Sequence, residues 1–181
     1  TSNYAQDVVV SGDYAYVADY YSGLVVVDVS DPTNPTKVGD IFTSGNAQGV
    51  ALSGGYAYVA DDTNGLVVVD VSDPTNPIYT ANYGAPSGDS EVSAHDVAVS
   101  GDYAYIVGSY GKLEVVNVSD PTDPNRMGSY DSNASTYGVA VSGDYAYVAG
   151  GHTGLVVVDV SDPTNPIRVG GYDTSASTYG V

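Results

Sequence analysis

Two histidines are the residues of this chain best suited to acid–base or metal chemistry, because an imidazole changes its charge near neutral pH. His95 and His152 could pair with Asp96 or Asp62 as a metal site or an acid–base site. The two histidines belong to different loops, the H-E-x-x-H spacing is absent, and no serine lies in a nucleophile-elbow motif. The sequence therefore predicts isolated surface histidines and no enzymatic activity, with a hydrolase or lyase built on a His/Asp site as the remote alternative.

Aspartates at turns are the second group that could hold a ligand. The chain has 22 acidic and 4 basic residues, and all of the acidic residues except Glu91 and Glu114 are Asp. An Asp side chain at a strand end or in a proline turn accepts hydrogen bonds from the amides that follow it, so turn capping is the expected role. The alternative is a weak calcium surface, since carboxylate oxygens suit Ca²⁺; no other cofactor is expected. The residues that would hold calcium are Asp28, Asp31, Asp70 and Asp73.

A third group lies in loops that differ from one internal repeat to the next, and such loops are where binding specificity is usually found. Aromatic rings for stacking and carboxylates for hydroxyl groups would suit a sugar or a peptide. The candidate ligand-binding residues are Tyr20, Tyr21, Asp61, Asp62, His95, Asp96, Tyr110, Tyr137 and His152.

The composition excludes several functional classes. A formal net charge of -18 repels nucleic-acid phosphates and anionic lipid headgroups. No apolar run approaches the roughly 20 residues that span a bilayer. Without cysteine the chain has no disulfide and no thiolate ligand. We therefore expect no nucleic-acid partner and no membrane insertion.

A repeat of about 42 residues must position all of these side chains. The string SGDYAYV begins at residues 11 and 142, with the variants SGGYAYV at 53 and SGDYAYI at 100. The string GLVVVDVSDPTNP begins at 23, 65 and 154, with a variant at 112. The repeats are predicted to cover residues 6–43, 48–85, 94–131 and 137–174, within one domain, and a loop insertion lies near residues 84–94. Residues 175–181 are expected to begin a further repeat or to dock as a tail.

Each repeat reads as four short strands. In the third, Leu24 and Val26 point to one face while Val25 and Val27 point to the other, so both faces must be covered. Four-stranded sheets that repeat at this period and pack face to face are propeller blades. The sequence therefore predicts an all-β protein, a β-propeller of four four-stranded antiparallel blades, alone or within a larger ring or assembly.

The segment GLVVVDVSDPTNP, together with the YAYVA strand of the next unit, resembles the LVIVD repeat of bacterial and archaeal cell-surface and secreted β-propellers. The resemblance implies a propeller fold and an extracellular or cell-surface location, and it brings no shared catalytic mechanism. The third repeat departs from the pattern at Lys112, Glu114 and Asn117.

The main functional hypothesis is a non-enzymatic extracellular or cell-surface propeller with a structural, adhesive or self-assembling role, as a filament or surface layer. Near-identity of the repeats and the equivalent repeat positions of Val8 and Val181 motivate it, and the expected partners are other copies of the chain. The alternative is a glycan- or peptide-binding module on the variable loops, with a glycan or cell-surface protein as partner. Glycosylation sequons at Asn117 and Asn133 are compatible with a secreted protein.

Overall fold

The fold is all-β, as the repeat predicts. The computed structural model describes residues 4–84, 93–132, 134–174 and 178–181 of the chain. It contains four four-stranded antiparallel sheets, each a meander whose strands follow one another in chain order. Asn133, much of the loop insertion and the first residues of the expected tail lie outside the described residues.

The four sheets are the blades, and their strands lie within the predicted repeats. The first blade consists of β1 (Asp7–Ser11), β2 (Tyr14–Ala18), β3 (Leu24–Asp28) and β4 (Thr36–Ile41). The second consists of β5 (Gly49–Ser53), β6 (Tyr56–Ala60), β7 (Leu66–Asp70) and β8 (Ile78–Tyr83). The third consists of β9 (Ala94–Ser100), β10 (Tyr103–Gly108), β11 (Lys112–Asn117) and β12 (Asn125–Asp131), with the 3-10 turn η1 (Ser109–Gly111) between β10 and β11. The fourth consists of β13 (Gly138–Ser142), β14 (Tyr145–Ala149), β15 (Leu155–Asp159) and β16 (Ile167–Tyr172).

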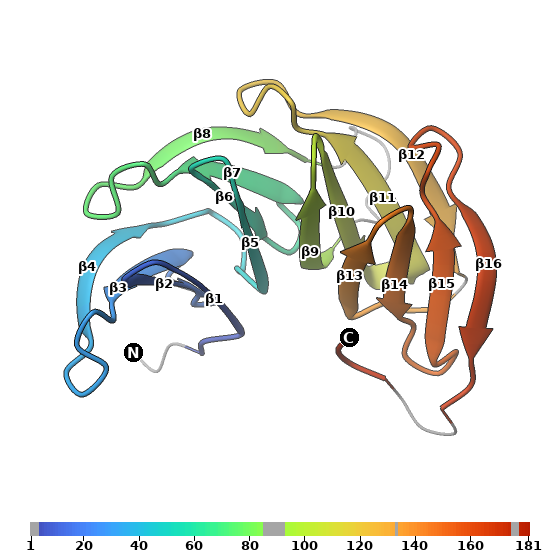
Figure 1. The fold of residues 1–181 in the computed structure, drawn as a ribbon, viewed down its shortest axis with the longest axis horizontal. Coiled ribbons are helices and arrows are strands. Elements are labelled where there is room, and N and C mark those ends of the chain that lie inside the picture. The colour runs from blue at the N-terminus through green and yellow to red at the C-terminus, as the bar shows by residue number, and fades with distance from the viewer. Residues whose placement is uncertain (1–3, 85–92, 133, 175–177) are drawn as a thin grey trace.

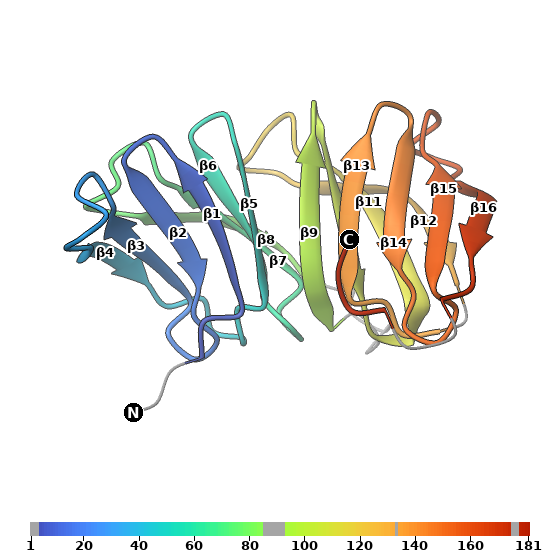
Figure 2. The same ribbon diagram turned by 60° about the horizontal axis from the view of Figure 1, so that its bottom comes forward.

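The blades stand side by side in an open arc (Figure 1). The first strand of each blade (β1, β5, β9 and β13) faces the inside of the arc, and the last strand (β4, β8, β12 and β16) forms its outer rim. The first and fourth blades stand apart, so the four blades do not close into a ring. Figure 2 shows the inner strands running in one direction, so that all four begin at the same end of the molecule. The residues that precede these strands are thereby brought close to the axis of the arc.

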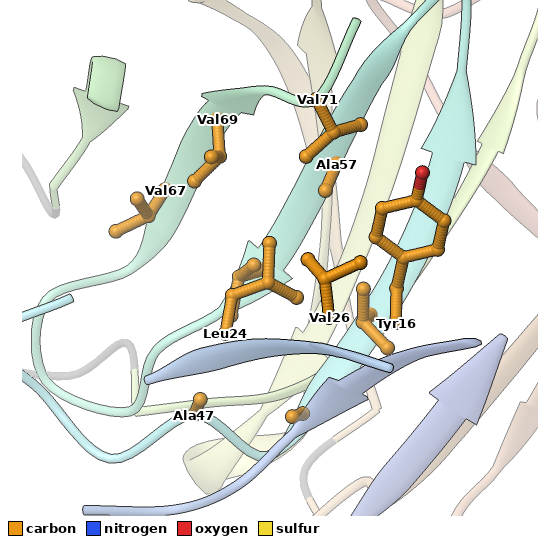
Figure 3. Packing of buried hydrophobic residues seen from close by; sticks show 11 residues of the cluster. Tyr16, Leu24, Val26, Ala47, Ala57, Val67, Val69 and Val71 are labelled. Carbon is orange, nitrogen blue, oxygen red and sulfur yellow. The ribbon is translucent and has the colours of Figure 1, made fainter. Parts of the chain in front are cut away.

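Apolar side chains on both faces of a blade hold the arc together. On the second blade, Val67 and Val69 pack toward the first blade, whereas Leu66 and Val68 pack toward the third. All four are fully buried, which is the two-sided burial that the third strand of the repeat predicts. Figure 3 shows part of the first interface, with Tyr16, Leu24 and Val26 against Ala57, Val67 and Val69. Burying one such Leu or Val side chain contributes roughly 1.5–3 kcal/mol.

The third blade differs from the others in the pairing of its first two strands. The register between β9 and β10 shifts between Val107 and Gly108, whereas the β1–β2, β5–β6 and β13–β14 pairs run without a shift. A bulge of this kind redirects the residues that follow it. Val107 pairs with Asp96 and Gly108 pairs with Ala94, so the extra residue of this bulge is His95 on β9.

Candidate functional site

A cavity lies at the end of the arc where the inner strands begin. Its volume is about 300 Å³. Most of its lining comes from equivalent positions of successive blades, at the start of each inner strand, and the rest from the C-terminal residues beside β13. The lining residues are Gln6, Asp7, Gln48, His95, Asp96, Tyr137, Gly138, Tyr179, Gly180 and Val181. We call this space the axial cavity.

Aromatic rings form one wall of the axial cavity. The imidazole of His95 stacks on Tyr137, with ring centroids 5.5 Å apart and an interplanar angle of 9°. Tyr137 in turn contacts Tyr179, with centroids 5.0 Å apart. The amides of Gln6 and Gln48 line the same space and can both donate and accept hydrogen bonds. The cavity therefore combines apolar ring faces with neutral polar groups.

The two carboxylates in the lining join neighbouring blades. Asp7 accepts the amide of Val8 at 2.8 Å and that of Val50, on the second blade, at 2.9 Å. Asp96 makes the equivalent contacts between the third and fourth blades, where it accepts hydrogen bonds from the amides of Val97 and Val139, both at 2.8 Å. These inter-blade clasps use both oxygens of each carboxylate. Burial raises the pKa of Asp96 to about 6, against the opposing effect of the two amide hydrogen bonds.

His95 is held by hydrogen bonds on both ring nitrogens. Its Nδ1 lies 2.9 Å from the carbonyl oxygen of Thr136, and its Nε2 lies 3.3 Å from Oγ of Ser109. A carbonyl oxygen only accepts, so Nδ1 must carry the proton. In the neutral ring Nε2 is then the acceptor, and the hydroxyl of Ser109 donates to it. The structure therefore brings together a serine, an imidazole and a fixed acceptor behind that imidazole.

Thr136 fixes Gly108 as well as His95. Its buried hydroxyl accepts the amide of Gly108 at 3.0 Å and donates to the carbonyl of Gly108 at 2.8 Å. A Cβ at position 108 would collide with the carbonyl oxygen of Ser93, so glycine is required there. The next residue is Ser109, followed by Tyr110 in the left-handed region with φ 64°. This backbone is uncommon for a residue other than glycine, and the corresponding loops of the first and second blades also contain one such residue each, Tyr20 and Asp62.

A second cavity borders the Ser109 side chain, and we call it the Ser109 cavity. Its volume is about 440 Å³. Its lining residues are Ser109, Tyr110, Asp131, Ala134 and Ser135. Because His95 lines the axial cavity and contacts Ser109, the Ser–His pair lies between the two spaces.

The structure brings only some of the predicted ligand-binding residues together. His95, Asp96 and Tyr137 meet in the axial cavity, and Tyr110 borders the Ser109 cavity. Tyr20 and Tyr21 contact each other in the β2–β3 loop, with centroids 4.6 Å apart. His152 is exposed in the β14–β15 loop. The two histidines therefore do not form the paired site that was weighed from the sequence.

Asp61 and Asp62 serve the backbone rather than a cavity. Asp61 is fully buried and accepts hydrogen bonds from the Thr43 hydroxyl at 2.5 Å and from the Gly45 amide at 2.9 Å. Asn64 donates to the same carboxylate. Asp62 accepts from Asn46 at 2.9 Å and from the hydroxyl of Ser93. The contacts with Thr43, Gly45 and Asn46 fix the connection between the first two blades, and the contact with Ser93 fixes the end of the connection between the second and third.

The aspartates considered for calcium are engaged in their own turns. Asp28 and Asp70 each accept the amide two residues on, at 2.9 Å. Asp31 and Asp73 each accept both the amide and the hydroxyl of a threonine two residues on. These hydrogen bonds hold the pKa of all four carboxyls below the usual value. Within the described ranges, no three His, Asp or Glu side chains gather where they could hold a metal ion. The contacts agree with turn capping, and calcium binding stays a prediction.

The sequence reasoning missed several residues of the site. Ser109 and Thr136 were not singled out, and neither were Gln6, Gln48 and Tyr179 as members of one cavity. The available signal was the third blade's loop, Gly108–Gly111, which differs from its counterparts in the other repeats. No local motif connects that loop with His95.

The LVIVD repeat model matches residues 2–43, 44–84, 92–132 and 134–174. The chain belongs to the LVIVD repeat family. A comparison with curated proteins gave no match. In the part of the chain that the structure describes, no helix is long and apolar enough to cross a membrane.

Two solved structures share the fold of this LVIVD protein. The periplasmic gluconolactonase of Pseudomonas aeruginosa superimposes with a TM-score of 0.79 over 96% of this chain, at 16% identity. A functionally unknown protein from Desulfotomaculum acetoxidans superimposes with a TM-score of 0.71 over 97% of this chain, at 14% identity. The chain spans 58% and 57% of the lengths of these two proteins. At such identities the likeness establishes the propeller fold and no activity.

The main functional hypothesis from the sequence is wrong. It held that the chain is a non-enzymatic structural, adhesive or self-assembling protein, yet the structure with a TM-score of 0.79 to it is an enzyme. Nothing in the described residues supports adhesion or self-assembly. Near-identity of the repeats, on which the hypothesis rested, is explained by the need of each blade to pack against the next.

Proposed function

We propose that this LVIVD propeller binds a small, neutral, hydroxylated ring compound, such as a monosaccharide or a sugar lactone, in the axial cavity. The observation that carries the proposal is the series of rings His95, Tyr137 and Tyr179, of which the first two are stacked, in a cavity that Gln6 and Gln48 also line. Aromatic faces pack against the C–H surface of a sugar ring, and amides exchange hydrogen bonds with its hydroxyl groups.

Size and charge narrow the class of ligand. A cavity of about 300 Å³ is at the lower end of ligand pockets, which favours one ring over an extended chain. The net charge of -18 disfavours anionic compounds. The clasp carboxylates of Asp7 and Asp96 still have lone pairs that can accept ligand hydroxyls. An extracellular or cell-surface location belongs to the same proposal, and the periplasmic origin of the gluconolactonase supports it.

Isothermal titration calorimetry with neutral monosaccharides, aldonolactones and the corresponding aldonates tests this proposal. We expect a neutral ring compound to bind, and the open-chain aldonate to bind at least about tenfold more weakly. Tyr137→Ala and Gln48→Ala should each weaken binding, because one removes the stacking face and the other an amide partner. Tyr172→Ala is the matched control, since Tyr172 is exposed on the outer strand β16. Binding that survives both cavity substitutions, or no binding across the panel, would refute the proposal.

A further inference from the structure

We propose that Ser109 and His95 form a nucleophile–base pair that hydrolyses a carboxylic ester or lactone. The proposal rests on the proposed function, because the hydroxylated part of the substrate would occupy the axial cavity while its carbonyl carbon meets Ser109. It adds a reaction, a substrate class and a nucleophile.

Hydrogen bonding prepares the imidazole to act as a base. Nδ1 of His95 donates to the Thr136 carbonyl at 2.9 Å, which leaves the lone pair of Nε2 directed at Ser109. In Ser–His pairs a third group behind the imidazole sets the tautomer and the ring orientation. The Thr136 carbonyl takes that place here. The stack on Tyr137 restricts the ring further.

The serine is held within reach of this base. The Oγ–Nε2 distance of 3.3 Å is longer than an ideal hydrogen bond, as is common for such pairs before substrate binds. Gly108 is fixed on both its amide and its carbonyl by Thr136, so the residue that follows has a defined position.

Space for a substrate exists on both sides of the pair. Ser109 lines the Ser109 cavity and is partly exposed there. His95 lines the axial cavity. An ester whose carbonyl carbon approaches Ser109 can therefore extend into one space with its acyl part and into the other with its alcohol part. The same placement suits a lactone, in which both parts belong to one ring.

The reaction requires only water as co-reactant. Oγ of Ser109 forms a bond to the carbonyl carbon while its proton moves to Nε2 of His95. The ester C–O bond then breaks, and Nε2 returns the proton to the departing alkoxide, giving an alcohol and an acyl-serine. A water molecule attacks the acyl carbon and gives one proton to Nε2. The Ser109–acyl bond breaks, the carboxylic acid leaves, and the proton on Nε2 passes to Oγ of Ser109.

Covalent labelling tests the pair separately from ligand binding. A small alkyl fluorophosphonate modifies an activated serine without needing the axial cavity, and peptide mass spectrometry locates the adduct. We expect one adduct, on Ser109, and release of p-nitrophenol from p-nitrophenyl acetate at the same site. Ser109→Ala should lower the esterase rate by about 10³-fold. Ser142→Ala, at the exposed end of β13, is the matched serine control and should keep the wild-type rate.

The outcomes separate this inference from the proposed function. Labelling elsewhere, or an unchanged esterase rate in Ser109→Ala with native circular dichroism, overturns the Ser–His pair. Labelling of Ser109 without any axial-cavity ligand keeps the pair and refutes the sugar proposal. Ligand binding that Ser109→Ala preserves, together with no adduct in the wild type, refutes the pair and keeps the cavity.

Discussion

The loop that follows the second strand has the same closure in the first, second and fourth blades and a different conformation in the third blade. In the first, second and fourth blades, the first loop residue donates its amide to a glycine carbonyl four residues on: Asp19 to Gly23, Asp61 to Gly65, and Gly150 to Gly154. In the third blade a register shift and the turn η1 replace this closure. The repeat thus keeps a standard loop where it only connects strands, and the exception is the loop that presents Ser109.

The second and third blades show what each version of the loop does. Asp61 opens the loop of the second blade, is fully buried, and accepts hydrogen bonds from Thr43, Gly45 and Asn64. Ser109 belongs to the equivalent loop of the third blade, is partly exposed beside a cavity, and has His95 as its partner. A carboxylate saturated by three donors stabilises the fold. A hydroxyl shared with one imidazole is available for reaction.

Replacing His95, the proposed base, is expected to have the largest effect on the reactivity of Ser109. If it had no effect, the contrast between the third blade's loop and the loops of the other blades would not hold. His95→Gln should lower the rate at which a fluorophosphonate labels Ser109 by at least about 100-fold, because glutamine cannot take up the serine proton. The rate is measured by following the adduct mass over time. His152→Gln is the matched control, since His152 is exposed on the fourth blade's loop. Equal labelling rates in His95→Gln and the wild type would contradict a base role for His95.

Removing the carboxylate of Asp61 should act on stability and leave reactivity alone. Asp61→Ala leaves the buried Thr43 hydroxyl without its acceptor and removes one from Asn64 and from the Gly45 amide. We expect a loss of about 3 kcal/mol or more in the free energy of unfolding, measured by urea denaturation. Asp123→Ala, on an exposed turn, should change stability by less than about 0.5 kcal/mol. A large fall in Ser109 labelling of folded Asp61→Ala protein would show that the two loops are not independent.

The clasp carboxylate of the third blade should give the smallest effect, visible as a pH dependence. The folded protein raises the pKa of Asp96 to about 6, above the value of about 4 in an unfolded chain. The folded state therefore holds the proton more tightly, and this stabilisation is complete below about pH 4 and is lost as the pH rises through about 6. We expect the urea midpoint to fall between about pH 4.5 and pH 7.5 in the wild type. The fall should be smaller in Asp96→Asn, and an equal fall in both proteins would refute the assignment.

The fold was predictable because its determinants are local and repeated. Alternating apolar residues on both faces of strands such as β7 require a neighbour on each side, and a period of about 42 residues fixes the blade size. The sequence does not show whether the blades close, since that depends on small rotations between blades, and the structure is an open arc (Figure 1).

The site was predictable only in part, for a physical reason. His95, near the start of β9, and Tyr137, just before β13, stand at equivalent repeat positions, so a propeller places them near one another. The Ser109–His95 contact depends on a bulge that leaves His95 unpaired opposite Val107 and Gly108, and on a carbonyl from Thr136, 41 residues away from His95 in the chain. Asp96 was predicted as a ligand-binding residue and lines the axial cavity, but the sequence does not show that its carboxylate also accepts hydrogen bonds from two backbone amides.

The inter-blade clasps near the axis make a pair of blades the repeating unit of the molecule, because each clasp joins two successive blades. Asp7 and Asp96 occupy equivalent repeat positions near the start of β1 and β9, where Gly49 and Gly138 stand in β5 and β13. Glycine is needed at 49, where a Cβ would lie 2.7 Å from Oδ1 of Asp96. Engineering that adds or deletes blades in pairs keeps carboxylate and glycine alternating. Deleting an internal blade, or inserting one between two existing blades, brings two carboxylates or two glycines next to each other, so the shortest internal unit of this propeller that can be exchanged is a pair of blades.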